Sequence, residues 1–304
     1  MKKSLGSRFV PRGVFWRQYL AWAVRNVPFF VEPILLWLWA TLFFLLWIPG
    51  RRGVARNMGA VFPGSSWLAL QSRAYRVFWN FACTLSDTAR FSQLQRAVDW
   101  EFEGVEYLEQ LAQSPEGALI LTAHMGNYDL GSFLFAEKLN RPITMIRAPE
   151  VDPETQRFAH QQRDATARNL EVTYNLESSV LAIDLVQALR DGKIVAIQGD
   201  RVVPGVTSVA TSLFGQPASL PSGPFALAMV TRVLVYPLFV ARVGRRRYRV
   251  LTFPPFRCER TGRNRQADID RCVAQWRPIL EQQIRDYWFQ WFAFEPFMEG
   301  PNNA

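Results

Sequence analysis

The 304-residue chain is predicted to form an α/β fold, in which a central, largely parallel sheet is flanked by helices and preceded by an N-terminal membrane-anchoring helix. Short apolar runs alternate with helical segments between residues 118 and 241, which is the order of strands and crossover helices in a parallel sheet. Polar side chains follow several of these runs, at the point where open α/β sheets bind ligands. The most hydrophobic segment, residues 34–48, precedes all of them. We therefore expect residues 1–55 to form the anchoring segment and residues 56–304 the α/β domain.

The composition favours a protein that works at a membrane. Charged residues make up 20% of the chain and aromatic residues 14%, with 11 Trp, and the net charge is +9. A basic surface attracts anionic lipid, nucleic acid or an acidic carrier protein, and nucleic acid is not expected because no recognition motif accompanies the charge. The cysteines, Cys83, Cys258 and Cys272, have neither metal-binding spacing nor the even number of a disulfide framework. We expect free thiols in a reducing compartment, and no metal or bound cofactor.

Residues 1–26 interleave basic and aromatic side chains, and the apolar segment 34–48 follows. A helix over this segment reaches about 22 Å, less than the roughly 30 Å of a bilayer's hydrocarbon core. Prolines interrupt any extension of it, and no small-residue cleavage site of a signal peptide follows. We interpret it as a membrane anchor that either spans the bilayer or lies as a re-entrant or interfacial helix; a buried core helix is the alternative. Another helix is predicted from Trp67 to about Ala89, where apolar residues recur at helical spacing.

The most informative stretch begins with the apolar run Ala118–Leu121, which is short enough for a buried strand. His124 follows, Gly126 permits a tight turn, and a helix is predicted from about Asn127 to Leu139. Asp129 lies in the first turn of that helix, where N–H groups are free and the potential is positive. A carboxylate that accepts from one imidazole nitrogen leaves the other nitrogen basic, so His124 and Asp129 form a candidate base and its orienter. The alternative is a capping Asp beside a chance His.

Two later strands also end in polar side chains. Residues 143–147 are predicted to form a strand ending at Arg147, whose guanidinium suits a phosphate or a carboxylate; a structural salt bridge is the alternative. A strand at 171–176 and a helix from Ser178 to Arg190 lead to a strand at 193–197, after which come Asp200 and Arg201. Asp200 is expected to pair with Arg147, to order a substrate, or to serve only as a turn residue.

The last third of the chain carries turn, strand and helix signals. Phe214-Gly215 falls in a turn, a helix start lies near Gly223, and residues 233–241 are predicted as a buried strand. Five arginines between Arg242 and Arg249 surround a turn into a strand at 250–253. They form either a solvated hairpin tip or a docking patch for an acidic carrier or lipid headgroups. The final helix is predicted from about residue 268 to residue 294.

The string His124-Met125-Gly126-Asn127-Tyr128-Asp129 resembles the first signature of the lysophospholipid acyltransferase superfamily, in particular its lipid A biosynthesis (late) acyltransferase branch. Further stretches match in the same order, so the resemblance covers about residues 15–295. Arg56–Pro63, the block with Asp200, Leu213–Ala218 and Ile279–Trp291 resemble the branch, and Arg147 and Pro237 resemble the second and fourth blocks of the superfamily. The branch usually carries Asp-Gln-Asp where this chain has a single Asp200, and Pro where it has Trp288 and Phe289. The acceptor is therefore left open between lipid A and another bacterial membrane lipid.

The resemblance implies a definite activity and location. The protein is expected to move a fatty acyl chain from a thioester donor, either acyl carrier protein or CoA, to a hydroxyl or amine of a membrane lipid. Residues 56–304 then form the catalytic domain, placed on the cytoplasmic face of the bacterial inner membrane, with His124 and Asp129 as its catalytic pair. The resemblance implies substrate contacts for Arg147, Asp200, Asn127, Gly126, Arg201, Phe214 and Gly215.

No Ser or Cys in a nucleophile-elbow pattern accompanies His124, so the acceptor's own hydroxyl or amine is expected to be the nucleophile. Two alternatives remain. A non-catalytic protein could use the same fold to bind lipid, or a hydrolase could use water as the acceptor. Thioester turnover separates the first alternative from an enzyme, and release of free acid without lipid marks the second.

Overall fold

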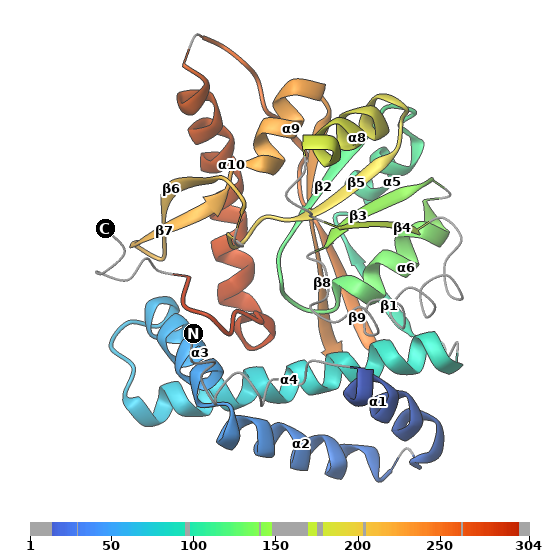
Figure 1. Ribbon diagram of the computed structural model, residues 1–304, viewed down its shortest axis with the longest axis vertical. Helices are drawn as coiled ribbons and strands as arrows, with labels where there is room; N and C mark the ends of the chain where they lie inside the picture. Colours follow the sequence, from blue (N-terminus) through green and yellow to red (C-terminus); the bar gives the residue numbers. More distant parts are fainter. Residues whose placement is uncertain are drawn as a thin grey trace.

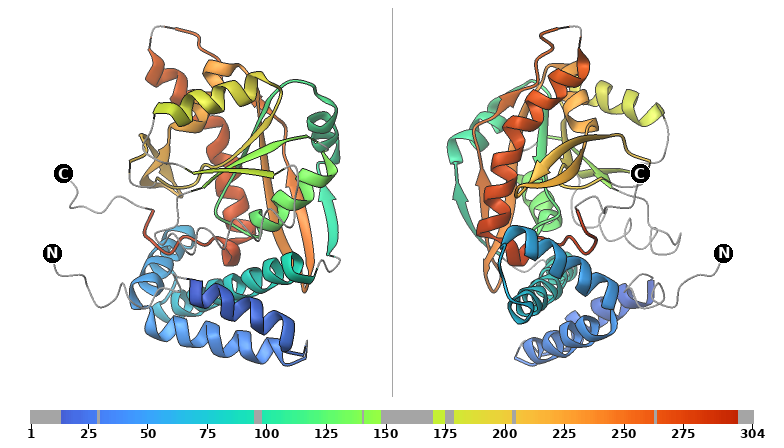
Figure 2. Two further views of the ribbon diagram at one scale, coloured as in Figure 1. Left: turned by 45° about the vertical axis from the view of Figure 1, so that its right-hand side comes forward. Right: turned by 90° about the vertical axis from the view of Figure 1, so that its left-hand side faces the viewer.

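The computed structural model describes residues 14–28, 30–94, 98–139, 141–147, 170–174, 179–202, 205–262 and 264–297. Ser178, the expected first residue of a helix, and the residues before Val14 lie outside these ranges. Figure 1 shows a sheet with helices on both sides and a group of helices at one end of the molecule, and Figure 2 shows the same group from two further directions.

The N-terminal group consists of α1 (Val14–Asn26), α2 (Glu32–Leu46), α3 (Ile48–Val61) and α4 (Trp67–Leu94). The first three helices pack against the long helix α4. Both α2 and α3 carry a proline in their first turn, where the missing N–H group costs nothing. The expected apolar helix is therefore present as α2, and α4 is somewhat longer than the predicted segment.

The central sheet has the strand order β1-β9-β8-β2-β5-β3-β4, with β10 paired to β8. Along this path every neighbouring pair is parallel except β8 and β9, which form an antiparallel hairpin, and β10 is antiparallel to β8. This confirms the predicted α/β fold with a largely parallel sheet. The strands are β1 (Asp99–Glu103), β2 (Ala118–Thr122), β3 (Ile143–Arg147), β4 (Leu170–Tyr174), β5 (Ile194–Gln198), β8 (Leu234–Gly244), β9 (Arg247–Thr252) and β10 (Phe256–Arg257).

Helices cover both faces of this sheet. Alternate residues of β2 show the division, since Leu119 and Leu121 join one buried cluster whereas Ala118 and Ile120 join the other. This is the two-residue period of a strand buried on both sides. The first cluster includes residues of α8 (Ser179–Arg190), α9 (Gly223–Thr231) and α10 (Arg265–Asp286), and the second includes residues of α5 (Val105–Gln113) and α6 (Tyr128–Lys138).

Two features differ from the prediction. Residues 208–221 form a separate hairpin, β6 (Ser208–Leu213) and β7 (Gln216–Pro221), with the expected turn at its tip. The last helix ends at Asp286, not near residue 294, and a short 3-10 turn follows at Trp288–Gln290. The helix does not continue because the backbone of Trp291 instead forms an antiparallel bridge with Met125, next to the candidate site.

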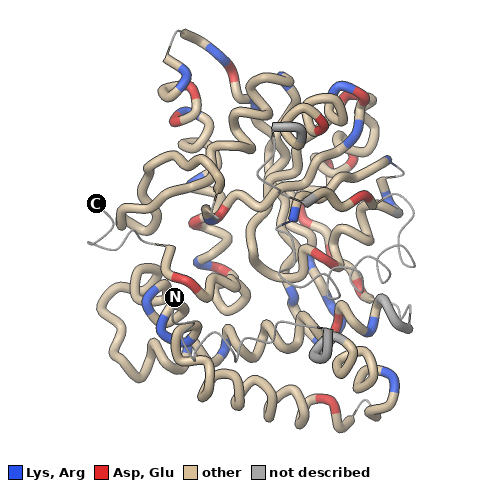
Figure 3. Tube along the Cα trace, viewed as in Figure 1, with Lys and Arg blue, Asp and Glu red and all other residues tan. Residues whose placement is uncertain are grey.

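No described helix is by itself long and apolar enough to span a membrane. Helices α2 and α3 meet that requirement together, but they bend by 91° at the break between them. Helix α2 carries a charge only at Glu32, as Figure 3 shows, and Glu32 is buried against α4. On its other side α2 exposes an apolar stripe at helical spacing, formed by Ile34, Trp37, Leu38, Leu42, Leu45 and Leu46.

Candidate functional site

Three neighbouring parallel strands bring the candidate site residues to one edge of the sheet. Strand β5 lies between β2 and β3. His124 follows the end of β2, Asp200 follows the end of β5, and Arg147 is the last residue of β3. The carboxyl ends of parallel strands are where α/β sheets bind ligands, so all three residues lie at the edge where a ligand is expected.

His124 contacts Asp200 through its side chain and its backbone. Its Nδ1 lies 2.7 Å from Oδ1 of Asp200, and its backbone N–H donates to the same oxygen at 3.1 Å. The other oxygen of Asp200 accepts from the indole N–H of Trp291 at 3.1 Å. The Asp200 side chain is fully buried, whereas that of His124 is 20% exposed. Because the carboxylate fixes a proton on Nδ1, Nε2 is the nitrogen left to act as a base.

The surroundings keep Asp200 ionised. Burial by itself raises the pKa of this carboxyl group. The facing His124 ring, the nearby Arg201 guanidinium and the hydrogen bond from Trp291 outweigh burial and hold the pKa at about 2. A permanent carboxylate is the group that orients an imidazole and stabilises the imidazolium formed when it takes up a proton.

Asp129, expected to orient His124, instead forms an ion pair with Arg147. Strand register explains the difference. Thr122 at the end of β2 pairs with Gln198 at the end of β5, so the residues two positions further on, His124 and Asp200, face each other. Asp129 lies in the first turn of α6, where its carboxylate meets Arg147 at the end of β3. The Arg147 guanidinium also lies 5.9 Å from the ring centre of Tyr128.

The loop that carries His124 is enclosed by the C-terminal segment at residues 290–292 and by strand β8. The N–H of Gly126 donates to the carbonyl of Gln290, and the N–H of Phe292 donates to the carbonyl of His124. Gly126 has a φ of +60°, and a Cβ built on it would lie 1.8 Å from the carbonyl oxygen of Val240. Only glycine fits such a position. Gly126 was expected to contact substrate, but its backbone is enclosed by Val240 and Gln290 of the protein itself.

Asn127 is also built into the protein. It is 1% exposed, and its side-chain oxygen caps α6 by accepting from the N–H of Leu130 at 3.0 Å. Its amide group donates to the Tyr248 hydroxyl at 3.2 Å. We expected this side chain to contact substrate, but the geometry gives it a structural task at the base of the His124 loop.

The remaining expected residues are Arg201 and the turn Phe214-Gly215. Arg201 donates to the carbonyl of Phe292 at 3.4 Å. Phe214 and Gly215 have φ values of +52° and +74° and form the two-residue tip of the β6–β7 hairpin. The N–H of Phe214 donates to Glu281 of α10, and its ring lies 6.3 Å from that of Trp291. Phe214 therefore reaches the candidate pair through Trp291.

Sequence reasoning missed the roles of Trp291 and Gln290. The Gln290-Trp291 pair stands in the C-terminal stretch that carries the family resemblance, which pointed to these residues without giving them a partner. Their contacts with Asp200 and Gly126 depend on the chain returning across the sheet edge after α10, which no local pattern encodes.

The arginine cluster on the β8–β9 hairpin is largely paired within the protein. Arg242 contacts Asp87 of α4, and Arg245 contacts Glu32 of α2. Arg247 and Arg249 share Glu101 of β1. These pairs hold the hairpin against α2, α4 and β1, which leaves less free charge for an acidic carrier than the sequence suggested.

The chemistry open to the site is acid–base chemistry. No group of three or more His, Cys, Asp or Glu side chains in the described part of the chain is placed to hold a metal ion. The three cysteines are buried free thiols, and burial raises the pKa of Cys83 to about 11. A thiol held in that state is a poor nucleophile.

Fold and site together define an α/β protein with an oriented histidine at the carboxyl edge of its sheet. The chain matches the family described as bacterial lipid A biosynthesis acyltransferase over residues 4–297, and it belongs to that family. This confirms the resemblance drawn from the sequence motifs. The chain is also 25% identical over 190 residues to phosphatidylinositol mannoside acyltransferases of two Mycobacterium tuberculosis strains, CDC 1551 / Oshkosh and ATCC 25618 / H37Rv. That alignment covers 62% of this chain and 58% of each relative.

Proposed function

We propose that the protein transfers a fatty acyl chain from a thioester donor to a hydroxyl or amine of a bacterial membrane lipid, with His124 as the general base. The observation that carries the proposal is the 2.7 Å contact between His124 and the buried Asp200 carboxylate at the carboxyl edge of the sheet. Family membership supports the reaction class. An oriented imidazole with one free nitrogen is suited to removing a proton from an alcohol or amine.

The reaction balances with groups that the chain and its substrates supply. Nε2 of His124 removes the acceptor's proton as the acceptor oxygen or nitrogen attacks the thioester carbonyl carbon. The C–S bond then breaks, and the leaving thiolate takes the proton back from the imidazolium. Asp200 stays ionised throughout and stabilises the imidazolium. The positive end of the α6 dipole, at the turn that begins with Tyr128, would stabilise the negative charge that develops on the carbonyl oxygen.

Arg147 is proposed to bind a phosphate of the donor or the acceptor. A guanidinium holds phosphate oxygens in bidentate fashion. Asp129 pairs with this guanidinium at the edge of the site, so its proposed task is to position Arg147. A catalytic role for Asp129 beside His124 remains the alternative to be separated by mutation.

The acceptor and donor are proposed by class. The name of the mycobacterial relatives favours a hydroxyl of a glycosylated phospholipid as one acceptor, and family membership favours a lipid A-like acceptor as the other. Acyl carrier protein and CoA both present their acyl chain as a thioester. The thioester is the part of the donor on which His124 would act, so the two donors are distinguished only by assay.

We propose that α2 seats the protein on the cytoplasmic face of the bacterial inner membrane as an interfacial helix. The support is the one-sided exposure of its apolar stripe, while Glu32 and Ala40 face the protein. Exposed Arg52 and Arg56 on the adjoining α3 suit anionic headgroups. A helix that packs on one side and exposes apolar residues on the other is typical of a protein lying on the bilayer.

The test uses the full chain reconstituted with bacterial lipid extract and supplied with either acyl-CoA or acyl carrier protein thioester. Acylated lipid is detected by mass spectrometry and released thiol by a colorimetric reagent. The wild type should produce both in equal amounts, and His124→Ala should lose about 10²–10⁴-fold in rate at an unchanged melting temperature. A folded His124→Ala protein with normal turnover would overturn the proposal. Free fatty acid as the product would indicate a hydrolase, and lipid binding without turnover a binding protein.

A further inference from the structure

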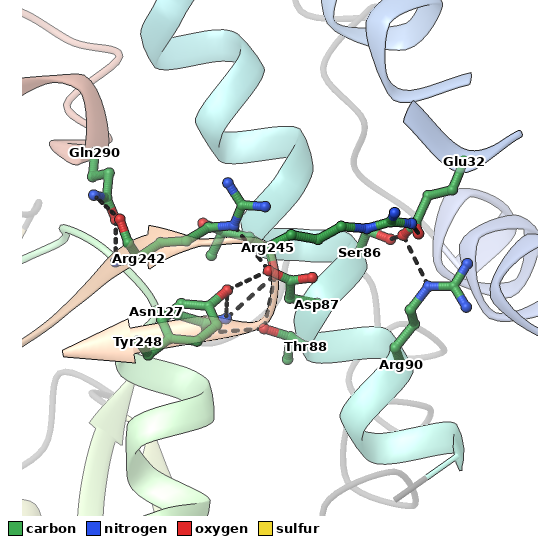
Figure 4. A network of polar contacts seen from close by, with 11 residues as sticks. Glu32, Ser86, Asp87, Thr88, Arg90, Asn127, Arg242, Arg245, Tyr248 and Gln290 are labelled. Atoms are coloured by element: carbon green, nitrogen blue, oxygen red, sulfur yellow. Dashed lines mark hydrogen bonds and ion pairs between the residues drawn. The ribbon is translucent and has the colours of Figure 1, made fainter. Parts of the chain in front are cut away.

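A buried chain of hydrogen bonds reaches the His124 loop from helix α4, as Figure 4 shows. Oδ2 of Asp87 accepts from the Tyr248 hydroxyl at 2.6 Å and from Nε of Arg242 at 3.0 Å. The same Tyr248 hydroxyl accepts from the side-chain amide of Asn127 at 3.2 Å. Asp87, Tyr248 and Asn127 are all buried, although they come from α4, β9 and the loop before α6.

The direction of each hydrogen bond in this chain is fixed. A carboxylate only accepts, so Tyr248 must give its single proton to Asp87 and receive the Asn127 amide on its oxygen. This orients the Asn127 side chain with its nitrogen toward Tyr248 and its oxygen toward the N–H of Leu130. Burial raises the pKa of the Tyr248 phenol, and the facing Asp87 raises it further, so the hydroxyl proton stays in place.

A second support meets the Asn127 amide from helix α4. The Thr88 hydroxyl lies 2.9 Å from Oδ1 of Asn127, and the carbonyl of Thr84 lies 3.4 Å from its amide nitrogen. Arg242, which contacts Asp87, also exchanges backbone hydrogen bonds with the side chain of Gln290. The carbonyl of Gln290 in turn accepts from the N–H of Gly126. The short segment between His124 and α6 is thus supported at both Gly126 and Asn127.

We infer that Asp87 and Tyr248 are positioning residues for His124, which act through Asn127 to hold the loop that carries the base. Both residues are buried, and their side chains contact each other and residues of the protein interior. Removing either residue should lower the fraction of molecules in which Nε2 of His124 is correctly oriented. This should lower kcat more than it changes KM. The inference rests on the proposed acyl transfer.

The decisive variant is Tyr248→Phe, which removes the hydroxyl that joins Asp87 to Asn127 and keeps the ring. Two matched controls exist in the chain. The Tyr75 hydroxyl bonds Thr41 between α4 and α2 at 3.0 Å, away from the loop, and the Tyr236 hydroxyl is buried with no hydrogen-bond partner among the described residues. Tyr248→Phe should lower kcat by about 10- to 100-fold at a KM within twofold of wild type. Tyr75→Phe and Tyr236→Phe should keep both parameters within about twofold.

Hydrogen exchange measured by mass spectrometry gives a readout that does not depend on turnover. Amides of residues 124–130 should exchange faster in Tyr248→Phe and in Asp87→Asn than in wild type. In the two control variants the same amides should exchange at the wild-type rate. The pH dependence of kcat should keep its shape, because the base itself is unchanged.

Unaltered kcat and unaltered exchange in a folded Tyr248→Phe protein would overturn the inference and reduce the network to packing. Failure of the proposed function is recognised separately, since wild-type turnover would then be absent or would survive His124→Ala. Thr88→Val, which removes the support on the other side of Asn127, guards against misfolding of a single variant. It should speed exchange in the same segment.

Discussion

Nδ1 of His124 lies 2.7 Å from Oδ1 of Asp200, although 76 positions separate the two residues in the chain. The contact exists because β2 and β5 are neighbours with matched ends. Asp129, only five positions from His124, turns instead toward Arg147. Strand order, rather than distance along the chain, therefore decides which carboxylate faces the histidine.

Asp200→Asn should cost far more in kcat than Asp129→Asn. An amide at position 200 can favour the wrong imidazole tautomer and does not stabilise the imidazolium, so a loss of roughly 10²–10⁴-fold is expected. Asp129→Asn should mainly raise KM, because it loosens Arg147. Steady-state kinetics of the two variants decide the matter. If the larger kcat loss fell on Asp129→Asn, the orienting role would belong to that residue.

Acid should remove the stability that Asp200 contributes. Its pKa is lowered from 3.8 to about 2 in the folded protein. The stabilisation is therefore fully present above the unfolded value of 3.8 and is lost as the pH falls through about 2. The free energy of unfolding of wild type should fall relative to Asp200→Asn over that window, by on the order of 2 kcal/mol. Urea titrations at several pH values measure the difference, and parallel curves for the two proteins would contradict the assignment.

Gly126→Ala should destabilise the protein and disable the site. The new methyl group would collide with the carbonyl of Val240, in addition to the strain of a positive φ. Gly64→Ala is the matched control, because Gly64 has a φ of +78° but nothing within 4 Å of the position that a Cβ would occupy. We expect about 1–2 kcal/mol for the control and roughly 3–5 kcal/mol for Gly126→Ala. Equal losses in denaturant unfolding would show that the enclosure by β8 is loose.

Charges placed on the α2 stripe should weaken membrane binding. Trp37→Glu and Leu45→Glu each remove an apolar side chain from the proposed bilayer contact, and partition onto anionic vesicles should fall about tenfold or more. Ile183→Glu on α8 is the control, since Ile183 is 67% exposed on a helix outside the N-terminal group. Vesicle sedimentation measures the effect, while thioester turnover in detergent should be unchanged. Undiminished binding by both α2 variants would place the membrane contact elsewhere.

Local patterns predicted much of the fold. The strand at residues 143–147 has the expected bounds, and those at Ala118 and Ile194 begin where apolar runs follow a breaker or a helix end. The turn at Gly126 and the tip at Phe214-Gly215 were also predictable. Both contain a residue with a left-handed backbone, and the glycine in each stretch indicates such a turn. The end of α10 was not predictable, since its last turns are replaced by pairing with the distant Met125.

The sequence by itself determined most of the strands of the parallel sheet, the α/β class, the family, and the histidine that opens the candidate site. These depend on periodicity, turn chemistry and contiguous motifs, all of which are local. Only the tertiary structure decided that Asp200 faces His124, that Asp129 holds Arg147, and that Asp87 and Tyr248 stand behind Asn127. The physical reason is that these contacts depend on which strands become neighbours. Strand order is set by the burial of both faces of the whole sheet, and it cannot be read from the distance along the chain between the contacting residues.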